Sequence, residues 1–345
     1  MRNLIRTRSK IRKSVLAVGL LSALPLMSCS DKSPHLVPVA KLKTEDKQEK
    51  PKGFISFNPK VDILFVIDNS GSMEPTQQML ALNIDKFAQG IANTSILDFH
   101  IGVLTTDMQE CTKSCGRLIG NPSFVTKQTP DLIQTLVNNF LVGISGDAIE
   151  MMFAPVVAAL SSPLESGVNK DFYRQDAMLA IFFITDAAEQ SAISEADFLK
   201  FLVDKKMDEK KILAYGVLRK IAEFPPCPGS ESLTNKLESF LDSVTNTDAF
   251  RGNVLSLCST DYGTKLAEYA KDIVKRSASV VRLNRLPQRN SIVVKYGTQE
   301  IPNDPTRGWV YEPSTNSLIL SETINWYAQP LGTELTVDFE VYEPM

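Results

Sequence analysis

The chain of 345 residues alternates apolar runs with stretches of helical periodicity from about residue 60 to residue 282. Val61–Ile67 and Met178–Thr185 are nearly continuous apolar runs, which predict strands covered on both faces, as in a parallel sheet. Between such runs, apolar residues recur at the spacing of a helix that lies against a sheet, as in Met73–Asn93. Strands that alternate with helices are typical of βαβ units. We therefore predict a doubly wound α/β domain with a mostly parallel sheet flanked by helices.

The same patterns predict the remaining helices and strands of the domain. A polar segment around Cys111 and Cys115, followed by Phe124 and Val125, indicates an excursion or hairpin at an edge of the sheet. Further strands are predicted at Asp98–Thr106, Lys211–Leu218 and Val254–Cys258, and further helices at Asp131–Leu141, Ala148–Leu160, Glu195–Val203, Leu233–Val244 and Tyr262–Arg276.

Helical periodicity ends near Leu283, and short strand patterns separated by Pro, Gly and Asn follow. These predict a small β module over residues 283–345. A core of about sixty residues is marginal alone, so the module should dock on the α/β domain or recruit a strand from Phe54–Phe57. Alternation along its strands places Trp309 and Tyr311 on one face, which favours core positions over a ligand platform.

The N-terminal segment predicts export. Six basic residues precede an apolar stretch, Val15–Met27, that is short for a membrane span, and Leu26–Cys29 is similar to the lipobox of bacterial lipoproteins. We expect a signal peptide at 1–28, a lipidated Cys29, a flexible tether at 29–55 and the α/β domain at 56–282. The alternatives are an uncleaved membrane anchor and a soluble secreted protein. The expected location is the bacterial cell envelope, on the outer membrane, facing the periplasm or the cell surface.

Net charge limits the kinds of partner that fit this chain, and cysteine content limits the kinds of compartment. Without the leader, 31 basic residues stand against 40 acidic ones, and no basic cluster indicates a groove for nucleic acid. The remaining four cysteines fit disulfides in an oxidising compartment. Of the three possible pairings we favour Cys111 with Cys115 and Cys227 with Cys258, and one zinc site of four thiolates is the alternative.

Oxygen-bearing side chains follow the first apolar run. Asp68 comes directly after it, and the spacing Asp-x-Ser-x-Ser lets Asp68, Ser70 and Ser72 converge while Asn69 and Gly71 shape the turn. Ligands of open α/β sheets bind beyond the carboxyl ends of such strands. The alternative is that a serine only caps the following helix, which has Pro75 in its first turn.

Asp68, Ser70 and Ser72 resemble the metal-ion-dependent adhesion site of von Willebrand factor type A domains. That resemblance implies two further ligands from later loops, for which this sequence offers Ser145, in place of the usual threonine, and Asp186 after the strand Met178–Thr185. It also implies Mg²⁺, with Ca²⁺ or Mn²⁺ as alternatives, because hydroxyls and carboxylates are hard oxygen donors.

Other side chains compete for roles near this set. Thr105 or Thr106, at the end of the second strand, is a competing oxygen source to Ser145. Asp147 and Glu189 are additional carboxylates, which either lie behind the metal ligands and support them or are simple solvated charges, and we take the latter as the default.

The resemblance implies a non-enzymatic, lipid-anchored binding protein whose cation binds an acidic residue of a partner protein, with the membrane contacted only through the anchor. A second hypothesis is a structural envelope lipoprotein with a stabilising or vestigial metal site. A phosphatase-like hydrolase would use Asp68 as nucleophile, but Ser70 stands where its general acid is needed. A serine hydrolase is disfavoured because His35 and His100 are poorly placed as bases.

Overall fold

The computed structural model describes residues 51–109, 111, 114–220, 227, 234–245, 252–330 and 332–343. The predicted signal peptide, Cys29 and the tether up to residue 50 lie outside the described residues. Within the described part, no helix is both long enough and apolar enough to cross a membrane.

A six-stranded sheet forms the centre of the α/β domain, in the order β4-β3-β2-β5-β6-β7. All neighbouring strands are parallel except β3 and β4, which are antiparallel. The predicted fold class and the predicted edge hairpin are thus confirmed. The strands are β2 (Lys60–Ile67), β3 (Asp98–Thr105), β4 (Phe124–Thr126), β5 (Met178–Thr185), β6 (Ile212–Leu218) and β7 (Val254–Ser256).

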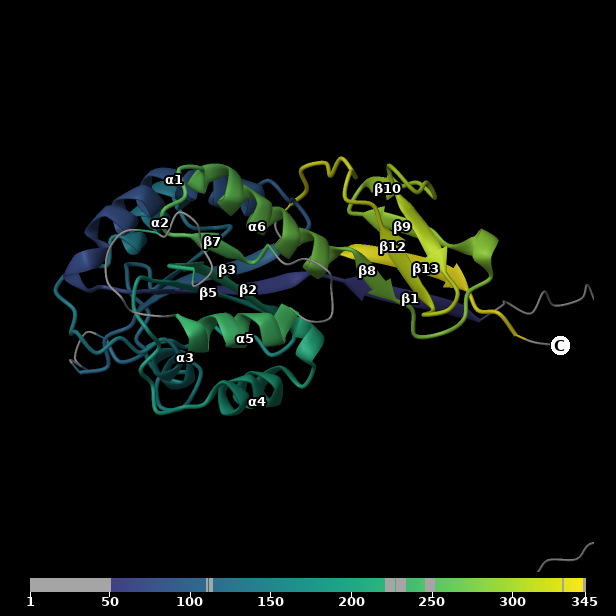
Figure 1. Ribbon diagram of the computed structural model, residues 1–345. Helices are drawn as coiled ribbons and strands as arrows, with labels where there is room; N and C mark the ends of the chain where they lie inside the picture. The colour runs from purple at the N-terminus through teal and green to yellow at the C-terminus, as the bar shows by residue number, and fades with distance from the viewer. Residues whose placement is uncertain are drawn as a thin grey trace, which may run out of the picture. The chain divides into compact units, whose positions relative to one another are not determined.

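Helices cover both faces of this sheet. The helices α1, α2 and α6 lie on one face, and α3, α4 and α5 lie on the other (Figure 1). In β2, Phe65 belongs to the core on the first face, and its neighbour Leu64 belongs to the core on the second. Alternation along a strand buried on both faces explains why nearly every position of β2 is apolar. The helices are α1 (Glu74–Ala92), α2 (Leu132–Phe140), α3 (Phe153–Ala159), α4 (Glu195–Lys206), α5 (Asn235–Thr245) and α6 (Tyr262–Ala278), with 3₁₀ turns η1 (Gly71–Met73) and η2 (Glu209–Lys211).

The helix predicted from Ala148 is wrong at its start, because α3 begins only at Phe153. The residues before it bond to loops of the sheet instead of to the next helical turn. The N–H of Met151 donates to the carbonyl of Thr106 at 3.3 Å, and the N–H of Gln190 donates to the carbonyl of Glu150 at 2.9 Å. These tertiary hydrogen bonds compete with the helix, and local periodicity does not reveal them.

The C-terminal β module consists of two small antiparallel sheets, β1-β13-β9-β10 and β11-β12-β8. The expected recruitment of an N-terminal strand is confirmed, because β1 pairs with β13 from Lys52 opposite Glu340 to Phe57 opposite Leu335. The predicted boundary at residues 55 and 56 stays a prediction, with β1 lying across it. The strands are β1 (Lys52–Phe57), β8 (Val280–Arg282), β9 (Val293–Tyr296), β10 (Gln299–Ile301), β11 (Trp309–Glu312), β12 (Ser317–Leu320) and β13 (Leu335–Glu340), and a 3₁₀ turn η3 covers Arg289–Ser291.

Trp309 is a core residue of this module, as expected. Its side chain is 3% exposed, and its indole N–H donates to the carbonyl of Ile301 at 2.9 Å. Tyr311 is partly buried against the same cluster.

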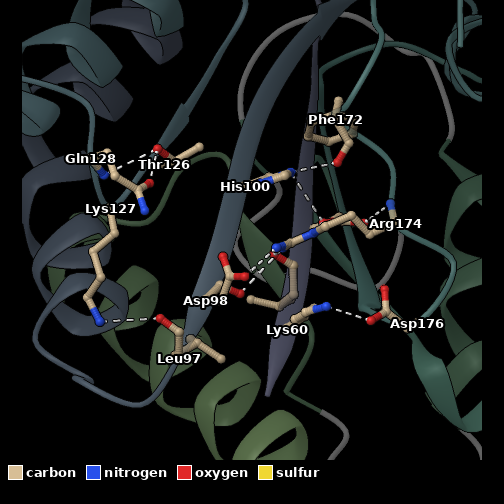
Figure 2. Close-up of polar contacts among 12 residues, drawn as sticks. Lys60, Leu97, Asp98, His100, Thr126, Lys127, Gln128, Phe172, Arg174 and Asp176 are labelled. Carbon is tan, nitrogen blue, oxygen red and sulfur yellow. Dashed lines mark hydrogen bonds and ion pairs between the residues drawn. The ribbon is translucent and has the colours of Figure 1, made fainter. Parts of the chain in front are cut away.

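A buried charge cluster lies near the amino ends of β2 and β3 (Figure 2). Asp62 is fully buried, and its two carboxylate oxygens accept hydrogen bonds from Nε of Arg174 at 2.8 Å and from the backbone N–H of Arg174 at 2.7 Å. Arg174 also pairs with Asp98, and the buried ammonium of Lys206 lies 3.7 Å from Asp62. The cluster connects the segment before β5 to β2 and β3.

His100 in β3 borders this cluster and lies 2.8 Å, through Nδ1, from the carbonyl of Phe172. A carbonyl can only accept, so Nδ1 carries the hydrogen. Burial lowers the pKa of His100 below its usual value, and the positive charge of Arg174 adds to this effect, although the Phe172 carbonyl and two nearby carboxylates oppose it.

We predict that His100 makes the protein lose stability on acidification. Below about pH 6.5 the unfolded chain takes up a proton on His100 that the folded chain binds less readily, so the free energy of unfolding falls as pH falls. In urea titrations between pH 7 and pH 5, wild type should lose more stability than His100→Asn, whose amide can still donate to Phe172. Equal pH dependences in the two proteins would contradict this.

Candidate metal-ion site

The candidate site lies where three adjacent strands of the sheet end together. Ile67 at the end of β2 is in register with Thr105 of β3 and with Ile184 of β5. The next residues, Asp68, Thr106 and Thr185, therefore follow at one level of the sheet edge, and all three are fully buried. Because β2 is central to this trio, its Asp68 stands between the other two strand ends.

Four hydrogen bonds hold Asp68 in place. Its backbone N–H donates to the carbonyl of Ile184 at 2.9 Å, and its own carbonyl accepts from Nε2 of Gln77 at 2.9 Å. One carboxylate oxygen accepts from the N–H of Ser70 at 2.8 Å, and the other accepts from the hydroxyl of Thr185 at 2.7 Å. Burial nevertheless raises the pKa of Asp68, and the charge of Asp186 adds to the effect.

The two serines connect this loop to the end of β5. The hydroxyl oxygens of Ser70 and Ser72 lie 3.1 Å apart, and the Ser72 hydroxyl donates to a carboxylate oxygen of Asp186 at 3.2 Å. The other oxygen of Asp186 lies 3.7 Å from the guanidinium of Arg219. Asp68, Ser70, Ser72 and Asp186 thus come together as the sequence predicted.

The alternative interpretation, that a serine of this loop only caps the following helix, is wrong. Ser70 precedes η1 and makes no capping hydrogen bond with its side chain, and the residue before α1 is Met73. The predicted proline in the first turn of α1 is present.

The segment that contains Ser145 contacts the loop, but the hydroxyl of Ser145 does not. The N–H of Gly146 donates to the carbonyl of Asn69 at 2.8 Å, and a Cβ on Gly146 would lie 2.5 Å from the side chain of Asn69. Ser145 itself is exposed, and its side chain forms no hydrogen bond with another described residue. Its role as a ligand stays a prediction.

A buried pair that the sequence analysis did not assemble occupies the inner side of the site. Thr106, named only as a competing oxygen source, donates its hydroxyl to one carboxylate oxygen of Glu150 and lies 3.4 Å from the amide oxygen of Asn69. Glu150 is 3% exposed, and its other oxygen is buried without a hydrogen-bond partner among the described residues. Burial raises the pKa of Glu150 to about 8, and the charge of Asp68 is the next cause.

One sequence signal pointed to Glu150. It is the single charge within the run Ala148–Met152, where a solvated side chain would have polar neighbours. Because a helix was predicted from Ala148, Glu150 was expected in its first turn, on the side that faces solvent.

The two remaining carboxylates have different environments. Asp147 is exposed, as expected. The expectation that Glu189 is a solvated charge is wrong, because its carboxylate is buried and accepts hydrogen bonds from the backbone N–H groups of Met152 and Phe153. Glu189 therefore satisfies free donors at the start of α3, where a negative charge is favourable.

The donor chemistry of the site fits a hard divalent cation. In the described part of the chain, no three His, Cys, Asp or Glu side chains are grouped so that they could hold a metal ion. Any cation would therefore depend on the hydroxyls as well. Serine hydroxyls and carboxylates together form an all-oxygen set suited to Mg²⁺, Ca²⁺ or Mn²⁺.

Both favoured disulfides are confirmed. Cys111 pairs with Cys115 at a Cα separation of 4.8 Å, and Cys227 pairs with Cys258 at 5.6 Å. The alternative of a zinc site built from the four thiolates is therefore wrong. The first disulfide closes a loop that follows β3 and is fixed by a hydrogen bond from the N–H of Cys115 to the carbonyl of Asp107 at 3.0 Å.

No protein-family model and no curated protein matches this sequence. Among solved structures, the chain is similar to a von Willebrand factor type A protein from Catenulispora acidiphila, with 14% identity, 86% of this chain and 67% of that chain covered, and a TM-score of 0.34. It is also similar to proximal thread matrix protein 1 of the mussel byssus with a zinc-occupied adhesion-site motif, with 9% identity, 68% and 52% coverage, and a TM-score of 0.38.

A third similar structure is the manganese-loaded TRAP protein of Plasmodium vivax, with 10% identity, 66% and 78% coverage, and a TM-score of 0.36. The chain spans about half the length of the mussel protein. At such identities and TM-scores, the function has to be argued from the geometry of this chain's own site.

Gln77 joins the site loop to the segment before α3. Its amide donates to the carbonyl of Asp68 and, at 2.8 Å, to the carbonyl of Gly143, and the side chain is 3% exposed. We predict that Gln77→Ala lowers the free energy of unfolding by about 2 kcal/mol, because two carbonyls lose a donor. The neighbouring Gln78 is exposed, so Gln78→Ala should change stability by less than about 0.5 kcal/mol in the same urea titration. Similar losses in both variants would contradict the linking role of Gln77.

Proposed function

We propose that the chain is a non-enzymatic binding protein of the von Willebrand factor type A kind. In this proposal Asp68, Ser70, Ser72 and Asp186 hold a divalent cation, through which the protein binds an acidic residue of a partner protein. The observation that supports it most is the hydrogen-bonded chain from Ser70 through Ser72 to Asp186 beside the buried Asp68. Two strand ends separated by more than a hundred residues thereby present their oxygens together.

Each residue has a separate part in the proposed site. Asp68 is fixed from both carboxylate oxygens and orients the turn, so that the two hydroxyls stand toward Asp186. Arg219 lies beside Asp186 and partly offsets its charge. A bound divalent cation would supply an electrophilic coordination position that a partner's carboxylate can fill. Mg²⁺ is the first choice from these four residues, with Ca²⁺ or Mn²⁺ as alternatives.

The geometry disfavours the hydrolase alternatives. Asp68 is fully buried and both of its oxygens accept hydrogen bonds, so it is poorly suited to attack a substrate as a nucleophile. Ser70 occupies the place where a phosphatase of this type needs its general acid. His100 bonds to Phe172 near the amino ends of the strands, whereas the serines lie at the carboxyl ends.

Export and envelope location belong to the same proposal. The two disulfides support an oxidising compartment, because disulfide pairs persist there. We propose the signal peptide, the lipid anchor at Cys29 and the tether from the sequence that precedes β1. A tether of that composition would keep the binding face away from the membrane surface.

A titration of the purified exported chain with Mg²⁺ tests the cation site. Wild type should give a binding isotherm, and Asp68→Ala should weaken affinity at least tenfold, because the serine turn loses its anchor. Asp147→Asn is the matched control, since this nearby carboxylate is exposed and should leave binding unchanged. Unchanged binding in Asp68→Ala would remove the proposed site.

A capture experiment tests the partner. The purified chain should retain a protein from the envelope fraction in the presence of Mg²⁺ and release it in EDTA, and Asp186→Ala should fail to retain it even with Mg²⁺. A partner retained equally in EDTA and by Asp186→Ala would place recognition on another surface. Cation binding without any such partner would favour a site that only stabilises an envelope lipoprotein.

A further inference from the structure

We infer that two copies of this chain associate through the free edges of their β1 strands. The two strands would pair antiparallel about a two-fold axis, with Phe54 of one copy opposite Phe54 of the other. The two four-stranded sheets would then form one continuous sheet, in the order β10-β9-β13-β1-β1-β13-β9-β10. This inference concerns assembly, and it does not depend on the proposed cation site.

The first argument is that β1 has an open edge. Among the described strands, β1 lies at one end of its sheet and pairs with β13 alone. The N–H of Val341 donates to the carbonyl of Pro51 at 2.9 Å, so these two opposite residues form a hydrogen-bonded pair. Such pairs alternate with non-hydrogen-bonded pairs along antiparallel strands. Gly53, Ile55 and Phe57 are therefore the residues of β1 that bond to β13.

The alternate residues, Lys52, Phe54 and Ser56, direct their backbone N–H and C=O groups to the open edge. No hydrogen bond joins these groups to another described residue. β1 has six residues, whereas the other edge strands of the described sheets, β4, β7, β8, β10 and β11, have three or four. Short edges are one way in which proteins avoid pairing with another chain, and β1 is the edge strand that lacks this protection.

The second argument is the side chain at the centre of this edge. Ile55 and Phe57 are partly buried against the core of the β module, but Phe54 on the opposite face of the strand is 57% exposed. Opposite residues of an antiparallel pair have their side chains on one face, with Cβ atoms about 5 Å apart. Pairing about Phe54 would therefore bring the two exposed rings into contact and remove both from water.

The third argument is charge complementarity, which favours a second copy over an unrelated extended segment. With Phe54 on the two-fold axis, Lys52 of each copy lies opposite Ser56 of the other. The hydroxyl of Ser56 donates to Glu334, and neither Lys52 nor Glu334 forms an ion pair with another described residue. Lys52 of each copy can thus reach Glu334 of the other. The same contact occurs twice, as an isologous two-fold interface requires.

This pairing leaves the candidate metal-ion site uncovered. β1 leads through Asn58 and Pro59 to the amino end of β2, and Asp68 follows the carboxyl end of that strand. The eight residues of β2 span about 26 Å. A pair of copies would therefore present two separate sites, and linked sites gain avidity for a partner that engages both.

A cysteine at the axis tests the pairing directly. Opposite Cα atoms of a hydrogen-bonded pair lie about 5.5 Å apart, which suits a disulfide. Mild oxidation of the purified exported chain carrying Phe54→Cys should give a covalent dimer on a non-reducing gel. Val293→Cys is the matched control, because Val293 and Phe54 are both opposite Asp338 and both exposed, but Val293 is in an inner strand. It should remain monomeric on the gel.

Sedimentation velocity of the purified exported chain tests the dimer without a cross-link. Wild type should show a concentration-dependent dimer, and Phe54→Lys should raise its dissociation constant at least tenfold, because two ammonium groups would then face each other. Tyr327→Lys changes another exposed aromatic residue of the β module and should dimerise like wild type. Lys52→Glu should weaken the dimer, and Glu334→Lys added to it should restore the dimer.

A wild-type chain that sediments as a monomer at every concentration overturns the inference. So does a Phe54→Lys variant that dimerises as wild type does, which is the result expected if the lipid anchor alone holds the copies together. Equal cross-linking of Phe54→Cys and Val293→Cys would place the contact on another surface and overturn it as well. None of these results bears on cation binding, which the Asp68→Ala titration tests separately.

Discussion

The site depends on one constraint, that three adjacent parallel strands covered on both faces must end at the same edge. A strand buried on both faces carries a charged side chain only where a partner compensates it, as Arg174 does for Asp62, so a carboxylate that is to face a ligand comes beyond the last paired residue. The register of β2 with β3 and β5 places Asp68, Thr106 and Thr185 at that position together. The side chains of three segments far apart in sequence converge there as a consequence of the sheet.

Hydrogen bonds then convert this convergence into a fixed geometry. Thr185 and the N–H of Ser70 hold the two oxygens of Asp68, and Gln77 links the carbonyl of Asp68 to the segment before α3. The buried carboxyl groups at the two ends of the sheet have different environments. Asp62 near the amino ends is paired with Arg174 and Lys206, and this cluster of three charges stabilises the fold. Near the carboxyl ends, one oxygen of Glu150 is buried without a hydrogen-bond partner among the described residues, and burial raises the pKa of Glu150 to about 8.

The same hydrogen bonds bear on the choice between the proposed binding role and a catalytic one. A buried aspartate that accepts hydrogen bonds on both oxygens is an orienting group, and the exposed hydroxyl of Ser72 is connected to Asp186. No histidine adjoins these hydroxyls among the described residues, since His100 is held by Phe172 and His35 lies outside them. The arrangement supports the proposed cation site over a hydrolase.

The sequence by itself determined the strands and the Asp-x-Ser-x-Ser turn, because burial on both faces demands unbroken apolar runs and the aspartate that ends such a run is conspicuous. Met178–Thr185 is predicted to the residue, and the disulfide pairing is also predicted correctly. Only the tertiary structure decided where α3 begins and which side chain of the preceding segment faces Asp68. Periodicity indicated a helix from Ala148, and backbone bonds to Thr106 and from Gln190 overrode it. Those bonds join residues about forty positions apart, so no local pattern could reveal that Glu150 is turned inward while Ser145 stays in solvent.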